Sequence, residues 1–222
     1  MSPLATLDAS NDRSESRTVE RSRFGRVAAY LAAPLWALQA AIWVAAPKVQ
    51  EPTAPFMITN PPLFVLFWLS IAGAVAFSAA CAADIPRIIQ GLGSRGSRWS
   101  KVFATISLGL ATAGTIAVVA AVVPGVQGLA IGVMTNLLNG ALVMLALSVS
   151  LSAFLSWRVD RAPRWTSILV AALAVATIAM IAAILASRSH SMIGLYVAVA
   201  VAVFNGIVWF LWARPSAIGR RR

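Results

Sequence analysis

The sequence has few charged residues, one cysteine and one histidine, and each of these shortages excludes a class of protein. Charged residues make up 11% of the 222 residues and hydrophobic residues 59%, whereas a soluble domain is typically about 25% charged. The lone Cys81 cannot form a disulfide within the chain. The lone His190 cannot build a multi-histidine metal or haem site. This composition indicates a membrane protein, and we expect neither a metal nor a cofactor.

Six long segments contain no Asp, Glu, Lys, Arg or His. Each is long enough to cross the roughly 30 Å hydrocarbon core as a helix at about 1.5 Å per residue. None shows the alternating pattern of a barrel strand, and in lipid a helix satisfies its backbone hydrogen bonds internally. The sequence therefore predicts an all-α, polytopic membrane protein with six transmembrane helices, over residues 27–46, 63–83, 102–123, 129–154, 166–186 and 193–212.

The basic residues are concentrated in alternate connections between these segments. Of the 18 Lys and Arg residues, 16 lie in the N-terminal tail, in segments 84–101 and 155–165, and after residue 212. The other two, Lys48 and Arg188, lie in connections on the opposite side. Cytoplasmic loops carry such an excess of positive charge, so we expect both termini in the cytoplasm. The net charge of +11 is then explained by topology, and we expect no nucleic-acid partner.

The two ends of the chain differ in composition from the six-helix domain, which we assign to residues 23–214. Residues 1–22 are polar, mixed in charge and poor in large apolar side chains, so they are predicted to be a disordered cytoplasmic tail. Residues 215–222 form a short basic tail on the same side. The strong preference for Arg over Lys is typical of GC-rich bacterial genomes, which would place the protein in the plasma (inner) membrane.

Several aromatic residues lie near the predicted helix ends, where amphipathic rings favour the membrane–water interface. We expect these residues to anchor the helices at that interface: Phe24, Trp43, Trp99, Trp157, Trp165, Trp209 and Trp212.

Four carboxamide side chains lie within the predicted spans, namely Gln39, Asn136, Asn139 and Asn205. A carboxamide in hydrocarbon is costly unless it finds a partner, so all four are predicted to face the interior of the bundle. One interpretation is hydrogen bonding between helices, worth about 0.6–2 kcal/mol per contact. The other is a polar lining for the path of a solute or of water.

Charged residues at the predicted cytoplasmic helix ends are the remaining candidates. Asp84 and Asp160 lie beside arginines, and we expect weak surface ion pairs, with a gating or proton-binding role as the alternative for Asp84. Arg95, Arg98 and Lys101 are expected to bind anionic lipid headgroups.

The glycines at 91, 93 and 96 match the spacing of a dinucleotide-binding loop. That loop requires a preceding strand in a βαβ unit, and here a transmembrane helix precedes it. We therefore expect no bound nucleotide.

A sparse internal repeat relates two predicted hairpins. Thr59-Asn60 precedes Asp84 by the same spacing as Thr135-Asn136 precedes Asp160, and Arg-Trp followed by Ser or Thr begins each next helix. Many transporters consist of repeated units with a site between them. The alternative is that interface preferences alone place these residues.

These observations favour a non-enzymatic protein that lets a neutral or lipophilic solute cross the membrane, in the manner of a permease. The first alternative is an accessory subunit of a larger membrane complex or a homo-oligomer, in which amides and small residues would face a partner. The second alternative is an intramembrane enzyme acting on a lipid or isoprenoid. It is disfavoured because Asp84 and Asp160 are predicted inside and His190 outside, so they cannot share one site.

Overall fold

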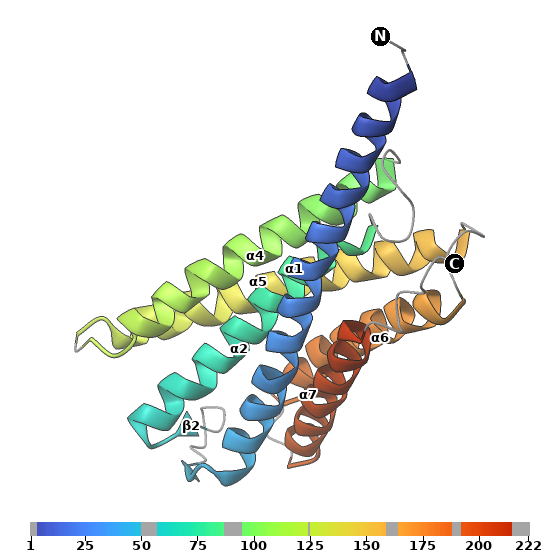
Figure 1. The fold of residues 1–222 in the computed structure, drawn as a ribbon. Coiled ribbons are helices and arrows are strands. Elements are labelled where there is room, and N and C mark those ends of the chain that lie inside the picture. Colours follow the sequence, from blue (N-terminus) through green and yellow to red (C-terminus); the bar gives the residue numbers. More distant parts are fainter. Residues whose placement is uncertain are drawn as a thin grey trace.

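The computed structural model describes residues 4–49, 57–86, 95–123, 125–158, 164–187 and 192–214. Six long helices dominate these residues (Figure 1), and each contains a segment apolar and long enough to span a membrane. The prediction of an all-α polytopic membrane protein with six spanning helices is thereby confirmed. The helices are α1 (Leu4–Ala45), α2 (Pro61–Ala82), α4 (Arg95–Ala120), α5 (Gln127–Arg158), α6 (Arg164–Ser187) and α7 (Met192–Ala213).

Several helices continue beyond the apolar segments that predicted them. Helix α4 begins at Arg95 rather than at residue 102, and α5 ends at Arg158 rather than at residue 154. The predicted boundaries mark where charge begins, which is the edge of the hydrocarbon. A helix that has already formed extends at little cost, because each added residue contributes one hydrogen bond.

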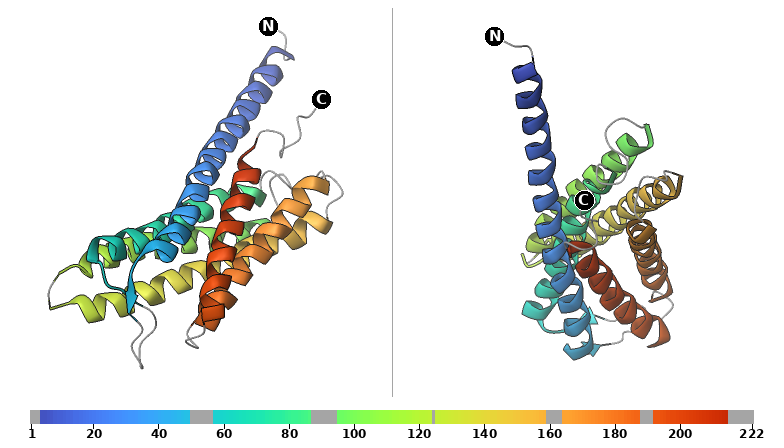
Figure 2. Two further views of the ribbon diagram at one scale, coloured as in Figure 1. Left: turned by 90° about the horizontal axis from the view of Figure 1, so that it is seen from below. Right: turned by 45° about the vertical axis from the view of Figure 1, so that its right-hand side comes forward.

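Helix α1 shows the same effect at larger scale. It begins at Leu4, so residues 4–22 are helical where we expected a disordered tail. The N-terminal part of α1 extends well past the ends of the other helices (Figures 1 and 2). Propagation from the apolar span accounts for this helix, because the polar residues need no core to continue a helix that is already nucleated.

A short hairpin at the other end of α1 connects it to α2. Strands β1 (Lys48–Val49) and β2 (Met57–Ile58) pair antiparallel, with Lys48 opposite Ile58. The Asn60 side chain then accepts a hydrogen bond of 3.1 Å from the Leu63 amide and caps α2. This hairpin fixes where the chain turns back into the membrane.

Each helix packs against the next one along the chain, and the last helix, α7, packs against α1. Helix α2 additionally packs against α5. Consequently α1, α2, α5, α6 and α7 form a five-helix ring, and α4 lies outside it against α2 and α5 (Figures 1 and 2).

Contacts at one end of the bundle bring the basic helix ends together. The start of α1 meets the end of α2, where a Cβ atom at Gly25 would lie 3.1 Å from Oδ2 of Asp84. The start of α4 meets the end of α5, where Gly96 packs against Leu155. The alternation of helix direction that the charge pattern predicts is therefore present.

Helices α4 and α5 are joined by a seam of small side chains. The buried residues of α4 recur at intervals of three and four, which is the spacing of an antiparallel coiled-coil face. They include Ser97, Ser100, Ala104, Ser107, Ala111, Gly114 and Val118. Small residues of this kind allow the backbones of membrane helices to approach closely.

Serine hydroxyls hydrogen-bond across this seam. Oγ of Ser100 lies 2.8 Å from Oγ of Ser152, and Oγ of Ser148 donates to the Ser100 carbonyl at 2.8 Å. Further along, Oγ of Ser107 donates to the Ala141 carbonyl at 2.7 Å. All of these serines are buried, and every one of their hydroxyls has a partner.

Two glycines of α4 provide a matched test of this packing. A Cβ atom at Gly114 would lie 2.7 Å from Cδ2 of Leu138, whereas one at Gly109 would meet nothing within 4 Å. We expect Gly114→Val to lower the free energy of unfolding by about 1–3 kcal/mol through overpacking, and Gly109→Val to change it little. Thermal unfolding of both variants in detergent measures the difference, and equal losses would contradict the close α4–α5 contact.

Candidate functional site

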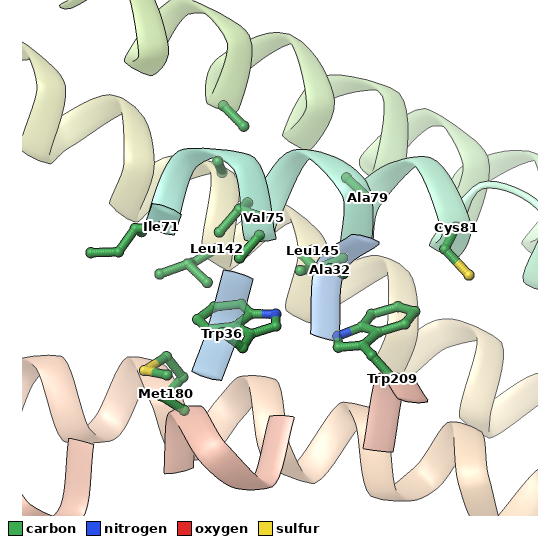
Figure 3. Packing of buried hydrophobic residues seen from close by; sticks show 14 of the residues in the cluster. Ala32, Trp36, Ile71, Val75, Ala79, Cys81, Leu142, Leu145, Met180 and Trp209 are labelled. Atoms are coloured by element: carbon green, nitrogen blue, oxygen red, sulfur yellow. The ribbon is translucent and has the colours of Figure 1, made fainter. Parts of the chain in front are cut away.

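The interior of the five-helix ring is filled by large uncharged side chains. Trp36 of α1, Trp209 of α7 and Met180 of α6 are almost completely buried there, together with Leu142 and Leu145 of α5 (Figure 3). Among the described residues, the buried polar ones are serines, threonines and Asn205, and none of them is charged. Any chemistry in this interior therefore depends on neutral donors and acceptors.

Trp36 connects α1 to α2 through its indole nitrogen. Nε1 of Trp36 donates to Oγ of Ser78 at 3.2 Å, and both residues are buried. The sequence did not single out this pair, because neither residue type is costly in a transmembrane helix.

Asn205 of α7 forms only part of the hydrogen bonds that an amide can form. Its Nδ2 donates to the Ala176 carbonyl of α6 at 3.1 Å and to the Val201 carbonyl of its own helix at 3.4 Å. Its Oδ1 is buried and has no partner among the described residues. Asn205 is 1% exposed and therefore lies buried within the bundle.

A second unpartnered atom lies one turn further along α7. Nε1 of Trp209 is buried, and its hydrogen has no acceptor in the described part of the chain. Residues four apart in a helix share a face, so an unpaired acceptor and an unpaired donor lie on neighbouring turns of α7. Figure 3 shows the nitrogen edges of Trp36 and Trp209 turned toward each other.

Gly206 lies between Asn205 and Trp209 in the sequence and brings α7 close to α1. A Cβ atom at Gly206 would lie 3.0 Å from the Ala33 carbonyl oxygen and 3.5 Å from Cβ of Trp36. Only glycine allows this approach without a shift of one helix. The contact places the Asn205–Trp209 face of α7 next to the Trp36 turn of α1.

Gln39 is the other amide with an unpartnered buried atom. Its Oε1 has no hydrogen-bond partner among the described residues. Gln39 is half-buried and lies midway between Leu35, which contacts Gly73, and Trp43, which stacks on Phe67. It therefore faces α2, as the prediction of an inward amide requires.

Of the two asparagines of α5, Asn136 does not follow that prediction. Asn136 is exposed and Asn139 only half-buried, so the expectation that Asn136 faces the interior is wrong for the single chain. The reason is the register of α5: Met134, Leu138 and Ala141 form its buried face. Asn136 falls on the opposite face.

That exposed face of α5 also carries two glycines. A Cβ atom at Gly128 or Gly132 would meet nothing within 4 Å. Gly128, Gly132 and Asn136 are spaced by four residues and therefore form one stripe. Glycine costs a helix about 1 kcal/mol relative to alanine, and packing within the chain does not explain these two.

The aromatic residues divide between the two roles that tryptophan can take in a membrane helix. Trp99, Trp157 and Trp165 are exposed near the basic helix ends, as predicted for interfacial anchors. Trp209 and Trp212 are buried within the bundle, so the prediction that these two rings anchor the helix at the membrane surface is wrong. Their spacing from Asn205 puts all three on one face of α7, which was the available signal.

The charged candidates lie away from the ring interior. Asp84 is half-buried beside Gly25, and the neighbouring Cys81 is buried and hydrogen-bonded to the Trp212 side chain. Arg95 and Arg98 are exposed, whereas Lys101 is half-buried. Asp160 and His190 lie outside the described residues.

The structure agrees with the internal repeat at one end only. Asn60 caps α2 from outside the helix, whereas Asn136 lies within α5. At the opposite end, Trp99 and Trp165 are both exposed, and Ser100 and Thr166 that follow them are both buried. The repeat stays a prediction.

No group of three His, Cys, Asp or Glu side chains that could hold a metal ion occurs in the described residues. Comparison of the chain with protein-family models, with curated proteins and with solved structures gives no match. A function has therefore to be inferred from the residues of the chain itself.

The buried Trp36 and Trp209 differ in hydrogen bonding, and replacing each by phenylalanine measures that difference. Trp36→Phe removes the donor to Ser78, whereas Trp209→Phe removes a donor without a partner in the described residues. Both substitutions remove the same volume, so we expect Trp36→Phe to cost about 1 kcal/mol more free energy of unfolding. Thermal or denaturant unfolding in detergent gives both values. An equal or larger loss for Trp209→Phe would show that its indole is bonded in the resting protein.

Proposed function

We propose that the protein is a permease-like carrier through which a small neutral solute crosses the plasma membrane of a bacterium. The observation that carries this proposal is a pair of buried atoms on α7, Oδ1 of Asn205 and Nε1 of Trp209, that have no hydrogen-bond partner among the described residues. Buried polar atoms without partners are costly, and a solute that pairs with them would remove this cost.

The chemistry of the two atoms limits the solute. Asn205 offers an acceptor and Trp209 a donor. A hydroxyl or amide group can donate to the first and accept from the second. A charged solute would find no opposite charge among the buried described residues, and its desolvation would be very costly. The same absence disfavours coupling to protons, so we expect downhill passage.

Passage requires the ring to open, because Trp36 and Trp209 fill it. Pro34 lies in α1 two residues before Trp36 and has no amide hydrogen, so the Tyr30 carbonyl loses its helical partner. This weakens α1 at the level where it packs on Gly206 of α7. We propose that the α1–α7 contact is the part of the ring that moves.

A subunit that packs into a larger membrane complex is the second candidate, and a specific observation favours it. The stripe of Gly128, Gly132 and Asn136 faces away from the rest of the chain. Small residues beside an amide are the usual interface of associating membrane helices. This stripe lies on α5 and is separate from the buried face of α7, so the two candidates can be tested with different variants.

The carrier proposal predicts a defect in solute movement when Asn205 is replaced by leucine. Purified protein is reconstituted into liposomes, and the entry of glycerol and of urea is followed by light scattering after an osmotic jump. We expect wild-type protein to admit at least one of these solutes faster than protein-free liposomes. Asn205→Leu should return that rate to the protein-free value, because the substitution removes the acceptor.

Asn136→Leu is the matched control, since it makes the same substitution on the exposed face of α5. We expect it to retain the wild-type rate. The proposal is contradicted if Asn205→Leu also retains that rate, or if wild-type protein accelerates neither solute. A stoichiometric partner that co-purifies in mild detergent and is lost in Asn136→Leu would favour the second candidate instead.

A further inference from the structure

The basic ends of α4 and α5 form a junction outside the five-helix ring. A Cβ atom at Gly96 would lie 2.9 Å from both Cδ atoms of Leu155, so the start of α4 and the end of α5 are in direct contact. Arg95 is adjacent to Gly96, and Arg158 follows Leu155 by one turn. Both arginines are exposed, and they therefore flank the same contact from two helices.

Exposed aromatic rings lie beside each arginine. The guanidinium of Arg158 lies 4.6 Å from the centre of the Phe154 ring. On α4, the rings of Trp99 and Phe103 lie 6.0 Å apart. Trp99 and Phe154 are 58% and 54% exposed, which on a membrane helix means exposed to lipid. The junction thus presents cations at its end and an aromatic wall along its side.

Neither helix of this junction contributes a negative charge, and the described Asp84, which follows α2, lies against Gly25 of α1. The described residues from 95 to 214 include no Asp or Glu. The first backbone amides of α4 add the positive end of its helix dipole. A phosphate group is the ligand that two arginines and a helix start favour most, because guanidinium groups bind its oxygens in a bidentate manner.

We infer that an anionic phospholipid binds at the α4–α5 junction, with its phosphate between Arg95 and Arg158 and an acyl chain along Trp99, Phe103 and Phe154. This site differs from the headgroup site that the sequence predicts at Arg95, Arg98 and Lys101, because Arg158 of α5 takes the place of Arg98 and of the half-buried Lys101. It lies outside the five-helix ring and holds whether or not a solute passes through that ring.

Native mass spectrometry of the purified full-length protein tests this site with phosphatidylglycerol and phosphatidylcholine as probes. We expect wild-type protein to retain phosphatidylglycerol preferentially. In Arg95→Gln/Arg158→Gln, the affinity for phosphatidylglycerol should fall about 10- to 30-fold, because each basic side chain near the surface contributes about a factor of five. The matched control is Arg164→Gln/Arg214→Gln, which removes the same charge from α6 and α7 and should bind as wild type does.

A third variant, Arg95→Lys/Arg158→Lys, keeps the charge and tests the site even if the glutamine variant fails to fold. It should fold and bind phosphatidylglycerol within a few-fold of wild type. Equal losses in the site and control variants would show a response to net charge alone and overturn the inference. So would equal binding of the two lipids, or displacement of bound phosphatidylglycerol by millimolar inorganic phosphate.

Discussion

The inability of hydrocarbon to solvate a charge or an unpaired backbone group determines most of this structure. It requires six segments free of ionisable residues and requires each of them to be a helix. It also determines which polar groups remain inside. The described buried polar residues are serines, threonines and one asparagine. The side-chain hydrogen bonds that join helices come from hydroxyl, amide and indole groups.

Two parts of the bundle meet this requirement in different ways. Along the α4–α5 seam the side chains are small, the backbones lie close, and the hydroxyls of Ser100, Ser107 and Ser148 all have partners. Inside the five-helix ring the side chains are large, and Asn205 and Trp209 each have a buried atom without a partner among the residues that the structure describes. A fully bonded seam stabilises the fold, whereas unpartnered buried atoms leave capacity for a ligand. This contrast is why the proposed solute path lies in the ring.

Hydropathy and charge were sufficient to predict the number of helices, their spans and their alternation. They could not predict which face of each helix is buried, because these helices are apolar all round and the burial of a face depends on packing. Asn136 and Asn205 therefore looked equivalent in the sequence, yet one is exposed and the other buried. The three-and-four spacing of Ser97, Ser100 and Ala104 was a signal for the α4–α5 seam. The bond between Trp36 and Ser78 depends on the α1–α2 packing and left no signal in the sequence.

The orientation of the bundle is the claim on which the cytoplasmic placement of every basic helix end depends. Single cysteines at positions 2, 53 and 94, introduced into a Cys81→Ala background in intact cells, measure it through reaction with a thiol reagent that cannot cross the membrane. We predict that Thr53→Cys reacts in intact cells, and that Ser2→Cys and Ser94→Cys react only after lysis. Reaction of Ser2→Cys and Ser94→Cys in intact cells, with Thr53→Cys protected, would contradict the orientation.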